Sequence, residues 1–202
     1  MSDLANEQLQ LQYRTALEPF QGALIGAKPS RLNLREIRLQ AYITVRGVLA
    51  SAEVSEGLES AGLSTPAKLS STAHYATDGA DVLLWISPNE SLLISPMSQR
   101  DHWVQTLQRT LQGSFAAVID TSGSFNCLEL QGPAVEACLA KLSHYNFAER
   151  EFPVGKVVTT TLKGIPCHFV RMDRDCFRIL MRFSFSHYLY RLISHAAAAY
   201  QA

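Results

Sequence analysis

Residues 128–142 read LELQGPAVEACLAKL, an apolar run followed by a Gly-Pro pair and then a second apolar run. This order is typical of a strand, a tight turn and a helix, which is also how phosphate-binding loops are built. A phosphate-binding loop needs several glycines, so that successive backbone N–H groups can converge on the anion, but here Gly132 stands alone. Pro133 has no N–H to donate and suits the first position of a helix. We therefore predict a turn that serves packing, not a nucleotide site.

The run after this turn has the spacing of a helix that buries one face. Its apolar residues fall at i, i+3, i+4 and i+7, namely Val135, Cys138, Leu139 and Leu142. Upstream, residues 37–45 alternate between apolar and polar types, which predicts a half-buried strand. That strand ends at Gly47, and a weaker helical pattern follows it. We predict that Gly47 is a structural turn like Gly132.

The two halves of the chain follow the same plan when Gly47 is aligned with Gly132. In this register Ile43 falls on Leu128, Val54 on Leu139, and Trp103 on Tyr188. Each half reads strand, glycine turn, helix, hairpin and helix, and the hairpins are predicted to turn at 87–90 and 172–175. Strands that come in hairpins pair antiparallel. We therefore predict an α+β fold of two pseudo-repeated strand–helix–hairpin–helix units with antiparallel sheets.

The predicted domain organisation is one α+β domain over 33–202, preceded by an extension over 1–32. The pseudo-repeats cover about 35–113 and 118–197. The extension is rich in glutamine and predicted to be helical over 4–17, and we interpret it as a segment that reaches over another surface. The last helix is predicted to bury one stripe, which contains Phe185, Tyr188, Leu189, Leu192, Ile193 and Ala196.

Composition excludes several classes of protein. The formal net charge is zero, which argues against bulk affinity for nucleic acid. A zero net charge also weakens the solubility of the chain, so part of the surface is expected to be covered by partners. The four cysteines form no C-x-x-C pair, and the N-terminus lacks the pattern of a signal peptide, so we predict a reduced, cytoplasmic protein. No apolar run approaches the roughly 20 residues of a membrane span.

A search for catalytic or ligand-binding residues finds little. No metalloprotease, serine-hydrolase, phosphate-loop or dinucleotide motif is present. The segment 120–124 carries hydroxyls and a carboxylate, and a turn before a strand accounts for it. Cys167 and His168 are neighbours on a predicted strand, so they point to opposite faces and do not suit one metal ion. We predict no catalytic, cofactor-binding or metal-binding residue.

One cluster of basic residues leaves two interpretations open. Arg178 and Arg182 share a face of a predicted strand, and Arg171 and Arg174 lie near the turn before it. This patch is either a solvated outer face or a surface for an acidic partner. The scattered histidines, including His187 and His195, are predicted to lie on the surface.

Much of the chain between residues 35 and 196 resembles the gamma subunit of heterotetrameric sarcosine oxidase. The resemblance is carried by an Asp-x-Ser turn, a strand ending in Gly-Pro, a Phe-Pro-x-Gly segment and an aromatic-rich last helix. The matching residues are Asp120, Ser122, Gly132, Pro133, Phe152, Pro153, Gly155, Thr160, Ser184, Phe185, Tyr188 and Leu189. Ser87 and Ser91 depart from the pattern, where the family is expected to have glycine and tryptophan. Gly155 is the remaining predicted structural turn, beside Gly47, Gly132 and Pro133.

The resemblance implies a fold similar to the folate-binding domain of aminomethyltransferases. It also implies a small, non-catalytic subunit of a flavin-dependent oxidase that acts on sarcosine or a related N-methyl amino acid. Flavin, NAD, zinc and tetrahydrofolate are then expected in partner subunits, with none in this chain. The expected partners are alpha, beta and delta-type subunits, with alpha in direct contact, and no binding to nucleic acid or membrane is expected. Two alternatives stay open, namely a standalone folate-binding transferase and a monomeric interaction module.

Overall fold

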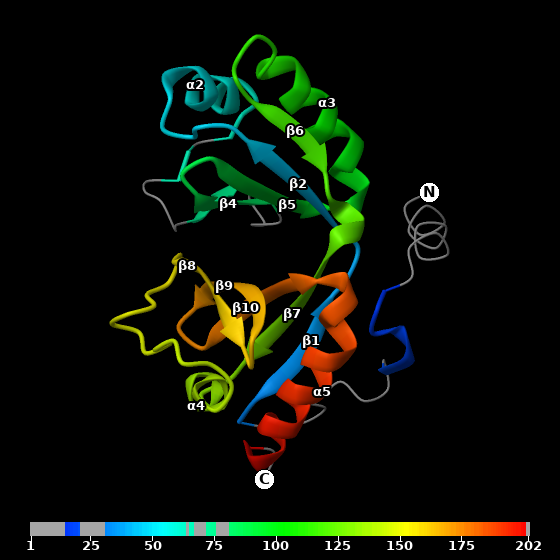
Figure 1. The fold of residues 1–202 in the computed structure, drawn as a ribbon, viewed down its shortest axis with the longest axis vertical. Helices are drawn as coiled ribbons and strands as arrows, with labels where there is room; N and C mark the ends of the chain where they lie inside the picture. The colour runs from blue at the N-terminus through cyan, green and yellow to red at the C-terminus, as the bar shows by residue number, and fades with distance from the viewer. Residues whose placement is uncertain (1–14, 21–30, 64, 67–71, 76–80, 201–202) are drawn as a thin grey trace. The chain divides into compact units, whose positions relative to one another are not determined.

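The computed structural model describes residues 15–20, 31–63, 65–66, 72–75 and 81–200. The chain divides into two compact units (Figure 1). The first comprises Met1–Leu39, Phe125–Val154 and Thr159–Ala202, and the second comprises Gln40–Ser124 and Gly155–Val158. In the described part of the chain, each unit combines antiparallel strands with two α-helices. The predicted α+β class with antiparallel sheets is confirmed.

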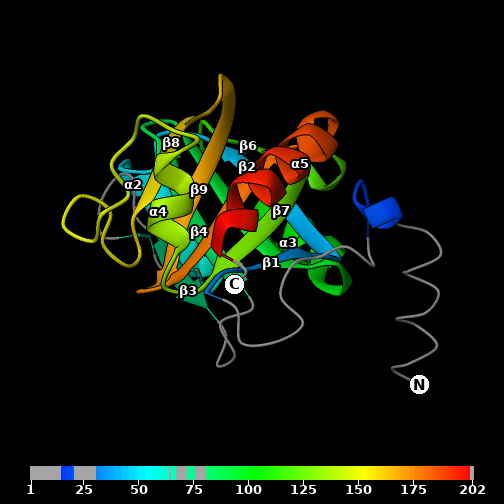
Figure 2. The same cartoon turned by 90° about the horizontal axis from the view of Figure 1, so that it is seen from below.

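The first unit is built on a five-stranded sheet in the order β1-β7-β10-β9-β8. Its strands are β1 (Asn33–Ile37), β7 (Phe125–Gln131), β8 (Val157–Leu162), β9 (Ile165–Asp173) and β10 (Cys176–Arg182). The predicted hairpin is confirmed, because β9 and β10 pair antiparallel on either side of Arg174 and Asp175. Helices α4 (Val135–Ala140) and α5 (Ser186–Ala197) lie side by side over one face of this sheet (Figure 2). Two short 3-10 turns, η4 (Phe183–Phe185) and η5 (Ala198–Tyr200), flank α5.

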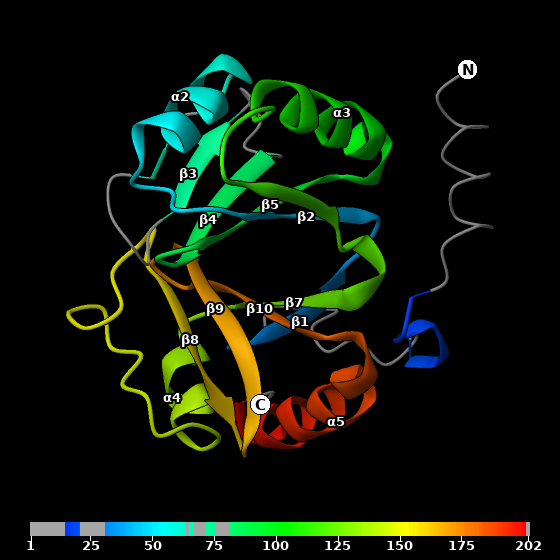
Figure 3. The same cartoon turned by 45° about the horizontal axis from the view of Figure 1, so that its top comes forward.

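The second unit has a five-stranded sheet in the order β3-β4-β5-β2-β6. Its strands are β2 (Gln40–Arg46), β3 (Thr72–Tyr75), β4 (Asp81–Ser87), β5 (Glu90–Pro96) and β6 (Ala117–Asp120). The hairpin predicted to turn at 87–90 is confirmed as β4 and β5. Helices α2 (Ala52–Ser60) and α3 (Arg100–Thr110) cover one face of this sheet (Figure 3). The 3-10 turns η2 (Met97–Gln99) and η3 (Ser122–Ser124) precede α3 and β7.

The two halves of the chain exchange a strand. β1 pairs with β7 of the second half, whereas β6 pairs with β2 of the first half. The prediction of one strand over 37–45 is therefore wrong: the chain leaves one sheet after Ile37 and enters the other at Gln40. Between them Leu39 has a φ of 54°, a conformation that interrupts a strand. β2 is also buried on both faces from Ala41 to Val45 and is not half-buried.

Apolar side chains on the helix-covered faces form the cores of the units. The predicted α4 stripe is confirmed, since Val135, Cys138, Leu139 and Leu142 are all buried. In the first unit the rings of Phe147, Phe152, Phe169 and Phe177 pack against one another. In the second unit the core joins α2, α3 and the sheet through Ile43, Val45, Leu49, Val54, Leu58, Leu63, Leu83, Leu93, Trp103, Leu107 and Leu111.

The buried face of α5 is rotated from the predicted one. Leu189 and Ile193 are fully buried as expected, but Tyr190 is buried as well. Phe185 and Tyr188, predicted to lie in the stripe, are instead 37% and 50% exposed. Seven of the twelve residues of this helix are apolar or aromatic, and with Tyr190 and Ala197 they spread over a wider arc than the predicted stripe, so the pattern alone did not define which side faces the sheet.

Residues 15–20 pack against the first unit and end in the 3-10 turn η1 (Glu18–Phe20). Leu17 is 1% exposed, and the Thr15 hydroxyl donates a hydrogen bond to Glu36 (2.8 Å). The ring of Phe20 lies 5.0 Å from that of Tyr190 on α5. These contacts make residues 15–20 part of the packed first unit. Residues 4–14 of the predicted helix over 4–17 lie outside the described residues. Of the remainder, Ala16 and Leu17 form a turn and not a helix.

Candidate functional site

The Gly132-Pro133 turn is closed by backbone from two other segments. Gly132 has a φ of 132°, and its N–H donates to the carbonyl of Asp175 (2.8 Å). The next N–H, that of Ala134, donates to the carbonyl of Arg31 (3.1 Å). The backbone N–H groups of Gly132 and Ala134 therefore donate to carbonyls of the same chain and not to a bound anion. This geometry supports the structural role that we propose for the turn.

We expect Gly132→Ala to lower the free energy of unfolding by about 2–4 kcal/mol. A Cβ at this position would lie 2.5 Å from the backbone oxygen of Arg31, and the φ is one that side chains avoid. The measurement is urea unfolding of the purified chain. Gly164→Ala is the matched control, because Gly164 also has a positive φ of 88° but no atom within 4 Å of the added Cβ. Equal losses in the two variants would show that the close contact with Arg31 is unimportant.

The other predicted turn residues lie in separate places. Gly47 follows β2, and an added Cβ would lie 2.9 Å from that of Ala116. Gly155 has a φ of 81° in the connection that leads to β8. Pro133 is exposed and is not the first residue of the helix as predicted, because α4 begins at Val135. The chain makes one further turn between them, closed by the hydrogen bond from the Val135 N–H to the Gly132 carbonyl.

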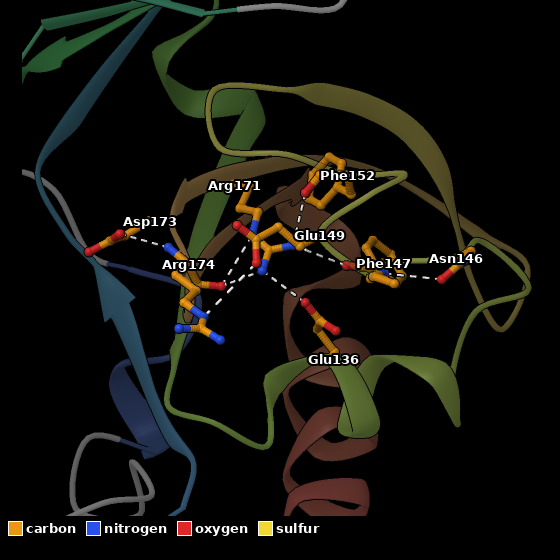
Figure 4. A network of polar contacts seen from close by, with 9 residues as sticks. Glu136, Asn146, Phe147, Glu149, Phe152, Arg171, Asp173 and Arg174 are labelled. Atoms are coloured by element: carbon orange, nitrogen blue, oxygen red, sulfur yellow. Dashed lines mark hydrogen bonds and ion pairs between the residues drawn. The ribbon is translucent and has the colours of Figure 1, made fainter.

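Arg171 is the most unexpected polar residue, since it is only 1% exposed. One terminal nitrogen, Nη1, donates to the carbonyls of Phe152 (2.9 Å) and Phe147 (3.3 Å). The other, Nη2, forms an ion pair with Glu136 of α4 (2.8 Å), and Nε donates to the carbonyl of Arg174 (3.1 Å) (Figure 4). The prediction that Arg171 belongs to an open basic patch is therefore wrong.

The guanidinium of Arg171 joins three parts of the first unit. It lies 4.8 Å from the centre of the Phe177 ring. It also reaches the aromatic segment that contains Phe147 and Phe152 (Figure 4). A guanidinium has five N–H donors in a fixed plane, which suits several fixed carbonyl acceptors. Arg171 thus holds the 147–152 segment, the β9–β10 turn and α4 together. An arginine within an alternating strand gives no local signal of this role.

A second charged cluster lies on the opposite face of the same sheet. Glu129 on β7 is 4% exposed and lies directly between Arg35 on β1 and Arg178 on β10. Arg178 Nε donates to Glu129 Oε2 (3.2 Å), and Arg35 Nε donates to Oε1 (2.6 Å). Arg182 instead lies over the ring of Phe125, 4.6 Å from its centre. The predicted patch is thus partly neutralised by a carboxylate that the sequence did not point to.

Within the 120–124 turn, the hydroxyls of Thr121 and Ser122 form hydrogen bonds with other groups of the chain. Ser122 Oγ donates to Asp120 and accepts from the N–H of Tyr42 (3.1 Å). Thr121 Oγ1 donates to the carbonyl of Tyr42 (2.9 Å) and lies 3.0 Å from the hydroxyl of Thr44. These bonds fasten the turn to β2. A nucleophile needs a base that accepts its proton, and the bonds of Ser122 provide a turn geometry instead.

The histidines and cysteines are dispersed. Cys167 is buried, whereas the Nδ1 of its neighbour His168 lies 2.8 Å from the Thr159 hydroxyl, as expected for residues on opposite faces. His187 contacts the carbonyl of Ala16. Across the residues that the structure describes, no three His, Cys, Asp or Glu side chains form a group that could hold a metal ion.

All four thiols are free, and burial raises the pKa of each from 9.0, to about 12 for Cys127 and Cys167 and to about 11 for Cys138 and Cys176. In the unfolded chain the thiols lose their protons near pH 9, whereas the folded chain retains them. The contribution of each thiol to the free energy of unfolding is therefore expected to be fully present below pH 9. It should fall as pH rises toward 12, by at most about 1.4 kcal/mol per pH unit for each thiol.

The measurement is the urea unfolding free energy between pH 8 and 11. Other groups also titrate in this range, so the comparison is with a Cys127→Ala, Cys167→Ala variant. The variant should lose less stability over the alkaline range than the parent chain. Equal pH slopes would contradict the assignment of the effect to these thiols.

A family model described as "Sarcosine oxidase, gamma subunit family" matches residues 49–199. Sarcosine oxidase subunit gamma from Corynebacterium sp. (strain U-96) is 30% identical over 172 residues, covering 83% of this chain and 82% of its own. The corresponding protein from an Arthrobacter species is 32% identical over 166 residues, with 82% and 78% covered.

Solved structures give the same picture. A chain of the heterotetrameric sarcosine oxidase from Corynebacterium sp. U-96, in complex with pyrrole 2-carboxylate, superposes with a TM-score of 0.85 and 26% identity. That match covers 95% of this chain and 97% of the other. Aminomethyltransferase T of the glycine cleavage system from Bartonella henselae shares the fold at a TM-score of 0.61 and 17% identity, with 81% and 45% covered. The predicted similarity of fold to aminomethyltransferases is confirmed. Among the described residues, no helix is long and apolar enough to cross a membrane.

Proposed function

Because this chain belongs to the sarcosine oxidase gamma subunit family, we propose that it is the gamma-type subunit of a heterotetrameric, flavin-dependent oxidase of sarcosine or a related N-methyl amino acid. The observation that carries the proposal is the structural match along 95% of the chain to a chain of the Corynebacterium oxidase. The match extends over nearly the whole chain, which supports the proposal that the two chains have the same role.

In this role the chain contributes architecture and not chemistry. The polar groups that the fold concentrates, around Arg171, around Glu129 and in the 120–124 turn, are bonded to one another. Groups that are satisfied in this way stabilise a fold and are poorly placed to bind substrate. Flavin, NAD, zinc and tetrahydrofolate are accordingly proposed to be held by partner subunits.

The direct partner is proposed to be the large alpha subunit, with beta and delta-type subunits completing the assembly. The domain over 33–202 would form the folded core of the subunit, and the extension over 1–32 would bind to the alpha subunit. Within that extension, residues 15–20 already pack on α5, so their first role is to complete the subunit itself. The four free thiols support a cytoplasmic location.

The test is co-expression of this chain, carrying an affinity tag, with alpha, beta and delta-type oxidase subunits from the same organism. The proposal expects the other subunits and a flavin absorbance spectrum to co-purify with the tag. The chain expressed alone should lack that spectrum. A chain that stays monomeric beside these subunits and binds tetrahydrofolate by itself would favour the standalone transferase instead.

A further inference from the structure

Three aromatic side chains lie exposed at the beginning of α5. Phe183 and Phe185 in η4 and Tyr188 in the first turn of α5 are 43%, 37% and 50% exposed, and we call them the aromatic patch. Their neighbours Ser186 and Leu189 are fully buried, so the helix cannot rotate to hide the patch without exposing its own core. Three large rings exposed within six residues present apolar surface that is favourable to bury against a partner.

The C-terminal segment that carries the patch contains arginines and no acidic residue. Residues 176–202 include Arg178, Arg182 and Arg191 but no aspartate or glutamate. Arg182 directly precedes the patch and is exposed, and Arg191 is exposed on α5. Segment 15–20, which packs on α5, brings one exposed carboxylate, Glu18. The patch therefore combines aromatic rings with arginines, which is the composition enriched at the centres of protein interfaces.

This composition selects among the possible occupants. A second copy of the chain in a symmetric contact would place Arg182 and Arg191 against the same arginines, and like charges at an interface are unfavourable. Nucleic acid would match the rings and the positive charge, but the whole chain has zero net charge and so lacks a long-range attraction for it. A protein surface with an apolar centre and acidic rim matches both properties.

We infer that the aromatic patch and Arg182 form the docking surface for the alpha subunit, on a region of that subunit with apolar side chains bordered by aspartate or glutamate. This inference rests on the proposed function and adds the residues and the chemistry of the contact. The rings supply buried apolar area, and Arg182 supplies orientation and faster association.

The test is a competition in one cell. Wild-type and variant full-length chains carry different tags and are co-expressed with the alpha, beta and delta-type subunits. The ratio of the two tags is then measured in the purified complex and in the total extract. The variants are Phe185→Ser with Tyr188→Ser, and Arg182→Glu. The controls are Phe115→Ser, an exposed ring at 95%, and Arg109→Glu, an exposed arginine on α3.

The double aromatic variant should be under-represented in the complex by about 30-fold or more, and Arg182→Glu by roughly 10-fold, with a smaller deficit at high salt. Both controls should be incorporated like wild type. A second readout needs no substitution: surface labelling of Tyr188 should fall when the free chain enters the complex. Thermal unfolding of each variant alone identifies losses that come from misfolding.

Each result decides between the two proposals. If wild type assembles and the patch variants assemble equally well, with Tyr188 still labelled, the docking surface is wrong and the proposed function stands. If wild type joins none of the subunits, the proposed function fails and the docking surface fails with it. A wild-type dimer that dissociates in the patch variants, or retention on nucleic acid through the patch, would also overturn the assignment.

Discussion

Replacing Arg171 with methionine is expected to lower the free energy of unfolding by about 3–5 kcal/mol. Methionine fills much of the volume but leaves the carbonyls of Phe147, Phe152 and Arg174 without the donor that they share. The first two of these hydrogen bonds are buried, where an unpaired acceptor costs about 1–3 kcal/mol. Glu136 is 42% exposed at its side chain and can return to water, so its loss of a partner adds less.

The measurement is urea unfolding of the purified chain, with two comparison variants. Arg174→Met lies on the same hairpin, but its side chain is 79% exposed, and we expect a change within about 0.5 kcal/mol. Arg171→Lys keeps the charge but has no planar fork, so it should fall between Arg171→Met and wild type. If Arg171→Met and Arg174→Met melted alike, the buried network would not stabilise the fold as described.

Leu189→Ala is expected to cost about 2–5 kcal/mol, because it leaves a cavity where α5 meets the sheet. Leu189 is fully buried and lies at the centre of the buried side of α5. The loss should appear as a lower denaturant midpoint with an unchanged slope, which indicates that the folded state is otherwise intact.

Tyr188→Ala is the matched control for this prediction. It removes a larger side chain from the neighbouring position, but half of that side chain is already exposed, so we expect a loss within about 1 kcal/mol. A larger loss for Tyr188→Ala than for Leu189→Ala would mean that the rotation of α5 is misassigned. His187 and Arg191 do not serve as controls, because both contact the segment 15–20 that packs on α5.

Local sequence patterns were sufficient to predict the features that depend on residues close together in the chain. The helix stripe of Val135, Cys138 and Leu139 is set by spacing alone, and all three residues are buried. The hairpin turns at Pro88-Asn89 and Arg174-Asp175 are likewise local. The repeat was also visible from the matched order of elements, because two similar units must satisfy the same local rules twice.

The break between β1 and β2 was hidden from the sequence for a physical reason. The alternation of apolar and polar residues runs through 37–45 without interruption. Such alternation indicates on which face of a sheet each side chain lies, but it does not indicate which strand pairs with it. Pairing with β7 on one side of Leu39 and with β5 and β6 on the other is decided by contacts far along the chain. Those contacts hold Leu39 at its positive φ.

The sequence by itself determined the α+β class, the repeat, the hairpins and the family resemblance, since each of these depends on periodicity, turn residues or spaced motifs. Only the tertiary structure decided which strands pair with the other half of the chain, which side of α5 is buried, and which groups bind the guanidinium of Arg171. Burial of a polar group depends on acceptors brought in from distant segments, such as the carbonyls of Phe147 and Phe152. A helix whose apolar arc is wider than the face it buries can likewise take up its orientation only when the sheet beneath it is in place.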